Sequence, residues 1–411
     1  MKKKYFYPLS EEGITNQDIA VANKVLKSKQ ITMSNYTRKF EKEFSKKIGS
    51  RYALMVNSGS SANLLAVFAA GNLMRKNRLK PGDEVILPIL CWPTSLWPLI
   101  QLGLKPIFVD IDKKNLNILE DQIEKKITKK TKAIMLINVL GNCCDLFKIK
   151  KIAKKHKLII FEDNCESLGS KYKNKNLGTF GDFGTFSFFY SHQITSGEGG
   201  MVTCNNPKDY EILFSLRSHG WLGGLMSYSR NMKTYNSYIK KNPNLDPRYI
   251  FTNSGFNLRP MDINASIGLN QFKKLDIFKK KRNKNRNLII KSLKSSANWD
   301  NQFSFIEARN DLNPSWMVLP IIIKTKFKKI KKKFLNFLDN NGVETRPIIS
   351  GSFNNQPAYK LYKFDKYNDK FFPNSQFIED HGFVIGLHKH QMKKTNIEKL
   401  SRLMMKIDLI K

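Results

Sequence analysis

Short apolar runs alternate with amphipathic stretches from about residue 52 to residue 202, and this pattern constrains the fold more than any other feature. The apolar runs include "ALMVN", "DEVILPI", "KPIFVDID" and "LIIFED", and amphipathic stretches such as "KIKKIAKKHK" separate them. Strands that alternate with helices predict a mostly parallel sheet that is covered on both faces. Ligands of such sheets bind at the carboxyl ends of the strands, so we expect the functional site there.

The rest of the chain predicts a second, smaller domain. A basic, helix-like stretch around residues 272–293 is expected to cross from the large domain to the small one. After it come a candidate strand "WMVLPIII", a helix "KIKKKFLNFLDNNG", a strand that begins "VETRPI" and a final helix "IEKLSRLMMKI", which suit an α+β domain. With 411 residues the chain is long for one compact core. We therefore expect a large domain over residues 1–270, N-terminal segment included, and a small domain over residues 271–411.

Composition narrows the classes of function. The formal net charge of +37 first suggests a nucleic acid or a membrane surface as partner. The lysines are spread through helix-like segments, however, and no helix-turn-helix, RNP or zinc-finger pattern is present. An anionic small substrate fits the charge equally well, so we predict neither partner. Because no stretch approaches the length of a membrane span and none resembles a signal peptide, we expect a soluble, cytoplasmic protein.

The five cysteines predict no metal site. They are odd in number, include one adjacent pair and show no C-x-x-C spacing, so neither a disulfide framework nor a zinc site is indicated. Small buried thiols are the favoured interpretation.

Polar motifs follow two of the predicted strands. The motif "NSGSSAN" at residues 57–63 precedes an apolar helix, where backbone N–H groups and the helix dipole suit a phosphate, although a turn with a helix cap would look the same. The motif "LIIFEDNCES" at residues 158–167 delivers Glu162 and Asp163 at the end of a buried strand. A carboxylate there is either a helix cap or the partner of a cationic ligand group, and Asp163 could hold a pyridine nitrogen protonated.

A third motif, "GTFGDFGTFSFFYSHQITSGEGGMV", covers residues 178–202 and contains Ser187 and, five residues later, His192. Taken alone, a histidine in a loop is more often structural than catalytic. Imidazole can nevertheless move protons, because its ordinary pKa of about 6.5 lies near neutral pH. It has no primary amine, so it cannot condense with a carbonyl group to form an imine.

Together these motifs resemble the DegT/DnrJ/EryC1/StrS sugar aminotransferases. The resemblance covers nearly the whole chain and is carried by fragments such as "NSGSSANLLA", "GDEVILP", "EDNCESLGS", "GEGGMV", "LRSHGW" and "GFNLRPMDINASIGLNQ". It implies the fold type I architecture of transferases that depend on pyridoxal 5′-phosphate (PLP), similar to aspartate aminotransferase. This architecture has a large α/β domain and a small C-terminal α+β domain. In the aminotransferases, the position of His192 holds the lysine that forms a Schiff base with pyridoxal 5′-phosphate.

The exchange of this lysine for His192 resembles the dehydratase branch of the family, the 4-keto-6-deoxyhexose 3-dehydratases. That branch implies pyridoxal or pyridoxamine 5′-phosphate that is not tethered to the protein, glutamate as amino donor and a nucleotide-sugar substrate. His192 would abstract the C4′ proton, after which the C3 hydroxyl would leave. The fragments "EDNCES", "FYSH" and "LRSHGW" are most similar to enzymes of GDP-4-keto-6-deoxymannose, which implies a dideoxy sugar of a surface polysaccharide as the end product.

The resemblance also assigns residues to the cofactor ring. Asp163 would pair with the pyridine nitrogen, and Trp92 would stack on the ring. His219 in "LRSHGW" matches a histidine placed near the cofactor, and Glu166 stands where the family often has glutamine. Without the resemblance, Trp92 and His219 would be read equally well as a packed aromatic and a helix-end residue.

Further residues would hold the cofactor phosphate. Gly59, Ser60 and Ser187 would contribute backbone and hydroxyl groups, and Asn257 of "GFNLRP" would reach in from a second subunit. The resemblance therefore implies a homodimer with shared active sites.

Several alternatives stay open. Gln193 stands where these dehydratases often have a second histidine, which leaves the proton relay and the exact substrate open. The related CDP-4-keto-6-deoxyglucose 3-dehydratase carries an iron–sulfur cluster on four C-terminal cysteines, and no cysteine follows Cys204 here, so that cluster cannot be built. A transaminase without a lysine tether would leave nitrogen in its product. A catalytically silent, cofactor-binding regulatory protein would bind the cofactor without turnover.

Overall fold

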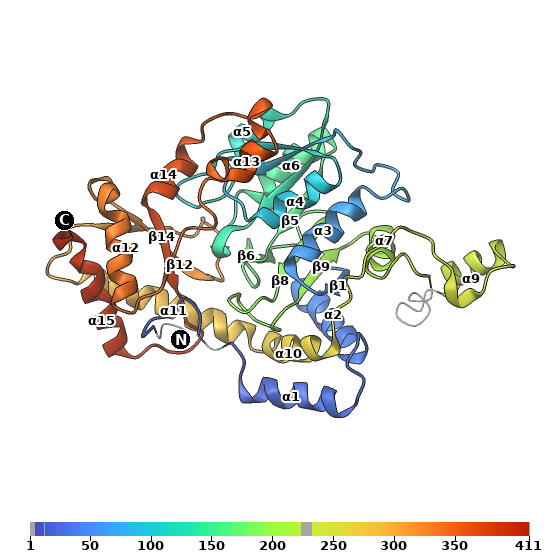
Figure 1. Cartoon of the computed structure of the whole chain (residues 1–411), viewed down its shortest axis with the longest axis horizontal. Helices are drawn as coiled ribbons and strands as arrows, with labels where there is room; N and C mark the ends of the chain where they lie inside the picture. The colour runs from blue at the N-terminus through green and yellow to red at the C-terminus, as the bar shows by residue number, and fades with distance from the viewer. Residues whose placement is uncertain (1–4, 12, 223–231, 411) are drawn as a thin grey trace.

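A seven-stranded sheet forms the centre of the molecule (Figure 1). The structure, a computed structural model, describes residues 5–11, 13–222 and 232–410. The strands lie in the order β1-β9-β8-β5-β4-β2-β3, and β9 alone runs antiparallel to its neighbours. Their bounds are β1 Tyr52–Val56, β2 Glu84–Pro88, β3 Lys105–Val109, β4 Thr131–Ile137, β5 Ile159–Asp163, β8 Phe183–Ser187 and β9 Gly200–Cys204. This arrangement confirms the predicted, mostly parallel sheet.

Helices cover both faces of this sheet. Successive residues of a strand point to opposite faces, and the strands carry apolar residues on both. On β2, for example, Val85 and Leu87 pack in the cluster that includes α3 and α4, whereas Ile86 packs with α5 and α6. The first face carries α3 (Gly59–Ala70), α4 (Pro93–Gln101) and α7 (Pro207–Arg217). The second face carries α2 (Asn35–Ile48), α5 (Glu120–Lys126), α6 (Leu146–His156) and α10 (Asp262–Phe272).

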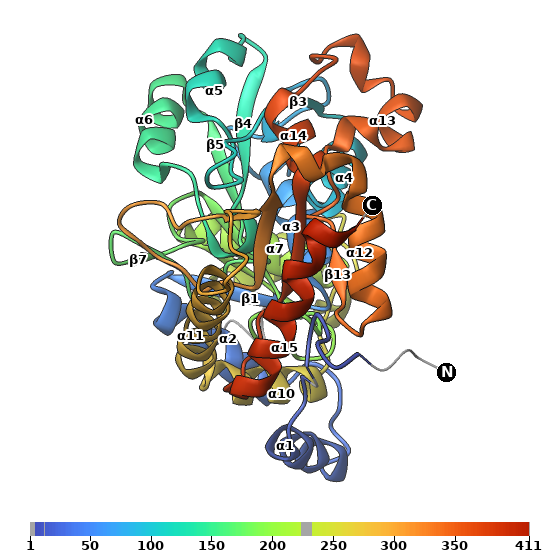
Figure 2. The same cartoon turned by 90° about the vertical axis from the view of Figure 1, so that its left-hand side faces the viewer.

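A second, four-stranded antiparallel sheet is built entirely from residues after position 302 (Figure 2). Its strands lie in the order β10-β12-β14-β13, and their bounds are β10 Phe303–Phe305, β12 Val318–Ile323, β13 Thr345–Arg346 and β14 Gly382–Gly386. The sequence predicts β12 and β13 but not β14. The helices α11 (Leu275–Lys294), α12 (Lys331–Asn340) and α15 (Lys394–Met404) confirm the predicted helical stretches. The domain boundary near residue 270 stays a prediction.

The N-terminal segment lies against this C-terminal sheet. Tyr7 forms a parallel bridge with Val343, and its hydroxyl donates a 2.7 Å hydrogen bond to the carbonyl of Gly386. The sequence predicts this segment as part of the large domain, which stays a prediction; its first described residues contact the C-terminal sheet.

Shorter elements complete the described chain. Among its helices, none is long and apolar enough to cross a bilayer. In Figure 1, α9 projects from the right-hand side of the molecule. The remaining elements are α1 Asn16–Lys27, α9 Met232–Lys241, α13 Pro357–Leu361, α14 Pro373–His381, and a small sheet of β6 Lys171–Tyr172, β7 Lys175–Asn176 and β11 Leu312–Asn313.

A buried carboxylate fixes the turn that leads into β8. Glu162, at the end of β5, accepts hydrogen bonds from the backbone N–H groups of Gly178 (2.9 Å), Phe180 (2.5 Å) and Gly181 (2.6 Å). A carboxylate without hydrogen bonds would be costly to bury, so these donors are a condition for its position. The interaction helps to align β8 beside β5, and Ser187 is the last residue of β8.

We expect Glu162→Gln to lower the free energy of unfolding by about 2 kcal/mol, because one amide NH₂ would face backbone donors in a buried site. Chemical denaturation monitored by circular dichroism measures this. Glu43→Gln, at an exposed position of α2, serves as the control that should leave stability unchanged. An equal effect of both substitutions would contradict the assigned role of Glu162.

Candidate active site

A cavity of about 650 Å³ lies where β1, β4, β5 and β8 end, between the two large sheets. We call it the central cavity. Its walls come from the residues that follow these strands and, on the other side, from β12, β13 and β14. Seven of the site residues predicted from the sequence line it: Gly59, Ser60, Trp92, Asp163, Glu166, Ser187 and His192. His219 and Asn257 do not line it.

The N-terminus of α3 forms one end of the cavity. Ser58 caps the helix through its side chain, which accepts a hydrogen bond from the N–H of Ser61. Helix geometry leaves the N–H groups of the first turn without partners in the helix. A Cβ atom on Gly59 would lie 2.4 Å from the Cβ atom of Ser187, so only glycine lets the serine hydroxyl approach the helix so closely. This end of the cavity therefore has the donors and the dipole that suit a phosphate.

Asp163, the last residue of β5, is buried and lines the central cavity. Its Oδ2 atom accepts hydrogen bonds from the Asn63 amide and the Ser95 hydroxyl, both at 2.7 Å. Its Oδ1 atom accepts the backbone N–H of Cys165 at 3.0 Å. These donors fix the orientation of a carboxylate that can pair with a cationic nitrogen in a ligand. Two of them, Asn63 and Ser95, were missed in the sequence, although they stand in "NSGSSAN" and directly after "CWPT".

His192 lies in the loop after β8, and its Nδ1 atom is 3.4 Å from the carbonyl oxygen of Ser187. Burial lowers the pKa of His192 from 6.5 to about 4. The imidazole is therefore neutral at neutral pH. If Nδ1 carries the proton toward the Ser187 carbonyl, the Nε2 atom is left as the basic nitrogen.

The buried side chain of Arg282 binds the backbone of the loop that contains His192. The guanidinium of Arg282 donates to the carbonyls of His192, Gln193 and Leu387, each at 3.0 Å. Arg282 belongs to α11, so the long helix that leads into the C-terminal part also positions His192. No sequence motif marks this contact, since the two residues are 90 positions apart.

Gln193 does not line the central cavity. Its side-chain amide donates to the backbone carbonyls of Glu166 and Ser315. Gln193 thus joins the loops around the cavity and is not placed to relay protons to a ligand.

Glu166 has an unusual environment for a carboxyl group. Its Oε2 atom accepts the backbone N–H of Leu140 at 3.1 Å. Burial, and to a smaller extent the nearby charge of Asp163, raises the pKa of Glu166 to about 8. The side chain is therefore largely protonated at neutral pH and can donate a hydrogen bond, as a glutamine amide does.

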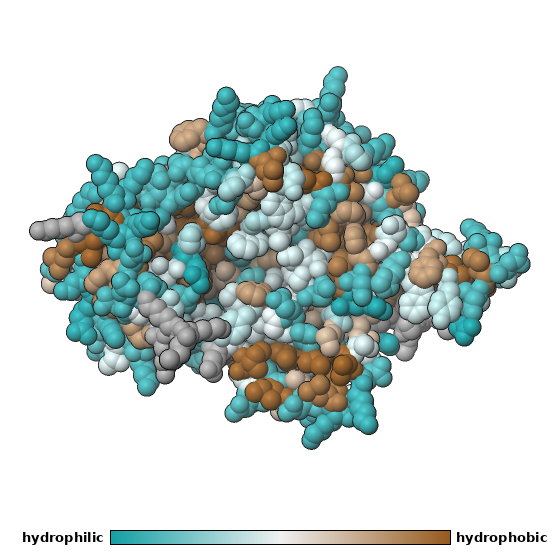
Figure 3. Space-filling view, in the orientation of Figure 1, coloured by the Kyte–Doolittle hydropathy of each residue, from teal (hydrophilic) through white to brown (hydrophobic). Residues whose placement is uncertain are grey.

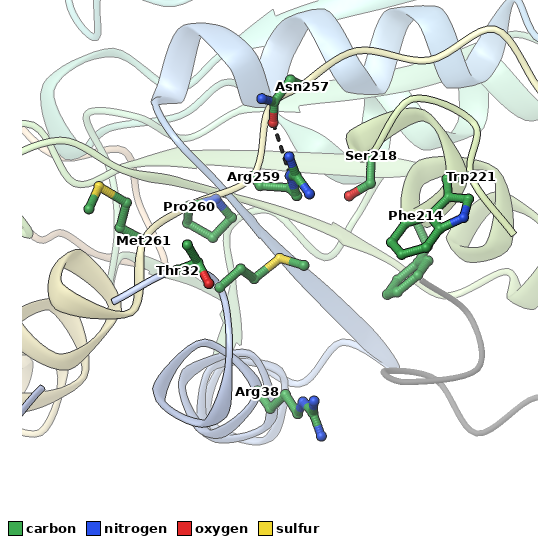
Figure 4. Close-up of a pocket in the computed structure, with 10 residues that line it drawn as sticks. Thr32, Arg38, Phe214, Ser218, Trp221, Asn257, Arg259, Pro260 and Met261 are labelled. Atoms are coloured by element: carbon green, nitrogen blue, oxygen red, sulfur yellow. Dashed lines mark hydrogen bonds between the residues drawn. The ribbon is translucent and has the colours of Figure 1, made fainter. Parts of the chain in front are cut away.

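A second pocket, of about 400 Å³, lies outside the central cavity, and we call it the outer pocket (Figure 4). Asn257 lines it and accepts a 3.0 Å hydrogen bond from Nε of Arg259. The ring of His219 lies 3.5 Å from the same guanidinium. The expected contacts of His219 and Asn257 with a cofactor therefore stay predictions, and for Asn257 the expected contact is with a second subunit.

Comparison with known proteins identifies the family that the sequence motifs resemble. The model of the DegT/DnrJ/EryC1/StrS aminotransferase family matches residues 12–404. GDP-4-keto-6-deoxy-D-mannose 3-dehydratase of Escherichia coli O55:H7 is 36% identical over 389 residues, which are 94% of this chain and 96% of that protein.

Two solved structures are similar over almost the whole chain. One is a GDP-4-keto-6-deoxymannose-3-dehydratase mutant with bound GDP-perosamine, with a TM-score of 0.86, 34% identity and coverage of 97% of this chain and 100% of that one. The other is a GDP-4-keto-6-deoxymannose-3-dehydratase with a trapped PLP-glutamate geminal diamine, with a TM-score of 0.83, 33% identity and the same coverage.

The environment of His192 makes a prediction about stability. Between about pH 6.5 and pH 4, the unfolded chain protonates this histidine and the folded chain does not. Lowering the pH through this window should therefore lower the free energy of unfolding, by about 1–3 kcal/mol from this group. Denaturation curves of the wild type and of His192→Asn at several pH values isolate the effect, because the variant lacks this titration. A constant difference between the two proteins across the window would contradict it.

Proposed function

We infer that this chain, which belongs to the DegT/DnrJ/EryC1/StrS aminotransferase family, is a PLP-dependent dehydratase that removes the C3 hydroxyl of a nucleotide-linked 4-keto-6-deoxyhexose. It has the fold type I architecture of PLP-dependent transferases. The observation that carries the inference is the identity of the base in the central cavity. Among the described residues that line it, none is a lysine, and the base present is His192. The family resemblance matches His192 to the position at which the aminotransferases have a lysine.

The residues present fit pyridoxal or pyridoxamine 5′-phosphate. The phosphate would bind at the N-terminus of α3 with the Ser187 hydroxyl, where a Cβ atom on Gly59 would close the gap. Asp163 would pair with the ring nitrogen, and the exposed ring of Trp92 at the cavity wall would cover the cofactor ring. When bound, this group accepts the negative charge that develops as a proton is removed beside its ring.

The protein residues then control protons and charge. His192 accepts a proton at Nε2, because burial keeps the imidazole neutral and the Ser187 carbonyl orients Nδ1. Once protonated, the same imidazole is an acid available to the departing C3 hydroxyl, which leaves as water. Glu166 stays uncharged at neutral pH and adds no further negative charge beside Asp163 and the phosphate.

GDP-4-keto-6-deoxymannose is the substrate we propose. The two relatives that are 36% identical to this chain are named for it, and one similar structure holds GDP-perosamine. Glutamate is the proposed amino donor, in line with the PLP-glutamate adduct of another similar structure. The overall reaction balances when the sugar loses one oxygen atom and glutamate becomes 2-oxoglutarate and ammonia. A cytoplasmic location stays a prediction.

We also propose a homodimer with shared active sites, in which Asn257 enters the site of the partner. Within its own chain, Asn257 lies outside the central cavity, at the exposed outer pocket. Near this pocket, an apolar surface lies over α1 and α10 (Figure 3), and Ile19 and Leu26 of α1 and Met261 just before α10 are exposed there. Such a surface suits a contact with a second subunit.

The first experiment incubates the purified protein with pyridoxal 5′-phosphate, glutamate and GDP-4-keto-6-deoxymannose. We expect a product that is lighter by one oxygen atom, together with ammonia, when the mixture is analysed by mass spectrometry. His192→Asn should lower the turnover number by about 100-fold or more, because it removes the general base. A product that retains nitrogen would show transamination instead, and cofactor binding without any product would indicate a silent protein.

A separate prediction concerns cofactor binding. Asp163→Asn should weaken the binding of pyridoxamine 5′-phosphate by about 10- to 100-fold, because it removes a charge-assisted hydrogen bond worth about 1.5–3 kcal/mol. Fluorescence titration of the apoprotein measures this. Asp365→Asn, on the exposed surface, is the matched control. Equal affinities for the wild type and Asp163→Asn would exclude the proposed pairing.

A further inference from the structure

The proposed function leaves the cofactor without a covalent bond to the protein. Imidazole forms no imine, and none of the described residues that line the central cavity is a lysine. The cofactor would therefore be retained only by noncovalent contacts, at the N-terminus of α3 and at Asp163. Water competes for such contacts, so a part of the protein that closes the cavity would slow the escape of the cofactor.

The start of the described chain also reaches the central cavity. We call residues 7–11 together with Gly13 the strap. Leu9 of the strap is partly buried and lines the cavity, and among the described residues it is the only one before position 58 that does so. The cavity is also lined by Val384 of β14 and by Phe189 of the loop between β8 and β9. Leu9 therefore adds a third, apolar element to a cavity that otherwise lies between the two large sheets.

Hydrogen bonds fix the first half of the strap to the C-terminal sheet. The N–H of Tyr7 donates to the carbonyl of Gly342 at 3.0 Å, and the carbonyl of Tyr7 accepts from the N–H of Glu344 at 2.9 Å. The N–H of Leu9 donates to the Glu344 carboxylate at 2.9 Å. A Cβ atom on Gly386 of β14 would lie 2.4 Å from the carbonyl oxygen of Leu9, so this glycine lets the strap lie directly against the strand.

The end of the strap contacts the opposite wall. The carbonyl of Gly13 accepts hydrogen bonds from the buried side chains of Gln271 on α10 (2.6 Å) and Lys389 (2.7 Å). A Cβ atom on Gly13 would lie 2.9 Å from Cγ2 of Thr195 and 3.3 Å from the ring of Tyr190. Both residues belong to the loop between β8 and β9, which also carries the base. The strap therefore spans from the C-terminal sheet to the loop of the base.

We propose that the strap closes the central cavity over the untethered cofactor. This inference rests on the proposed function. The strap moves away from one wall to admit or release the cofactor, and it lies across both walls during the reaction. In this closed position Leu9 excludes water from the space in which His192 moves protons. A drier site also strengthens the pairing of Asp163 with the ring nitrogen.

The first test distinguishes a closing element from a simple contact. For Leu9→Ala, we expect the rate constants for association and dissociation of pyridoxamine 5′-phosphate to rise together by about 10-fold, because less apolar surface holds the strap closed. Stopped-flow fluorescence measures both, and their ratio should stay within about threefold of the wild-type value. Leu361→Ala, at an exposed position of α13, should change neither rate. Unchanged rates for Leu9→Ala, or faster dissociation alone, would overturn the proposal.

The second test loosens the strap at its anchors and leaves the lining of the cavity intact. Tyr7→Phe removes the hydroxyl that donates to Gly386, and Lys389→Met removes a donor to Gly13; neither residue lines the central cavity. Each variant loses one buried hydrogen bond, so both rates should rise by about fivefold, and the amide hydrogen of Leu9 should exchange faster with solvent. Unchanged rates in either variant that keeps the wild-type circular dichroism spectrum would contradict the role of the strap.

These binding measurements separate the strap from the proposed reaction, because they need no sugar substrate. Rates that respond to the strap in a protein that does not dehydrate the nucleotide sugar would support the strap and overturn the proposed function. Turnover in a protein whose binding rates ignore the strap would do the reverse. A protein that binds no pyridoxamine 5′-phosphate would overturn both.

Discussion

The buried carboxylate of Asp163 is the constraint on which the site depends. Its two oxygens accept hydrogen bonds from α3 through Asn63, from α4 through Ser95 and from the backbone after β5 at Cys165. The amide oxygen of Asn63 in turn accepts the hydroxyl of Thr185 on β8. An anion at this depth is tolerable only with such donors, and a cationic ligand group would stabilise it further. The network therefore fixes the relative positions of two helices and two strands and leaves the carboxylate directed to a ligand.

Burial gives two ionisable groups of the central cavity, His192 and Glu166, opposite tasks. The same loss of water that lowers the pKa of His192 to about 4 raises the pKa of Glu166 to about 8. At neutral pH the imidazole is thus free to accept a proton, and the carboxyl group holds one. A lysine at position 192 would need a depression of its pKa by several units to act as a base, whereas histidine needs none. A histidine at position 192 cannot form the imine that a lysine would form with the cofactor, but it can still accept and donate a proton.

The sequence predicts the part of the site that follows from strand order. Once parallel strands are recognised, residues after β1, β5 and β8 must meet at one edge, and for this reason Gly59, Asp163 and His192 could be placed together. Contacts between distant segments leave no such pattern. Arg282 reaches His192 from a helix whose sequence shows only a basic face, and Asn63 could as well have been a surface residue. The contact of Tyr7 with Val343 joins two segments that are distant in the sequence and has no local signal at all.

The distribution of charge also explains how a chain with a net charge of +37 can have a cavity rich in carboxyl groups. The proposed pairing of Asp163 with a cationic ring nitrogen disfavours lysines or arginines nearby, because they would repel that nitrogen. The anionic end of a nucleotide sugar requires the reverse. The described lining of the central cavity meets the first demand with Asp163 and offers one cationic side chain, Arg346, toward the second.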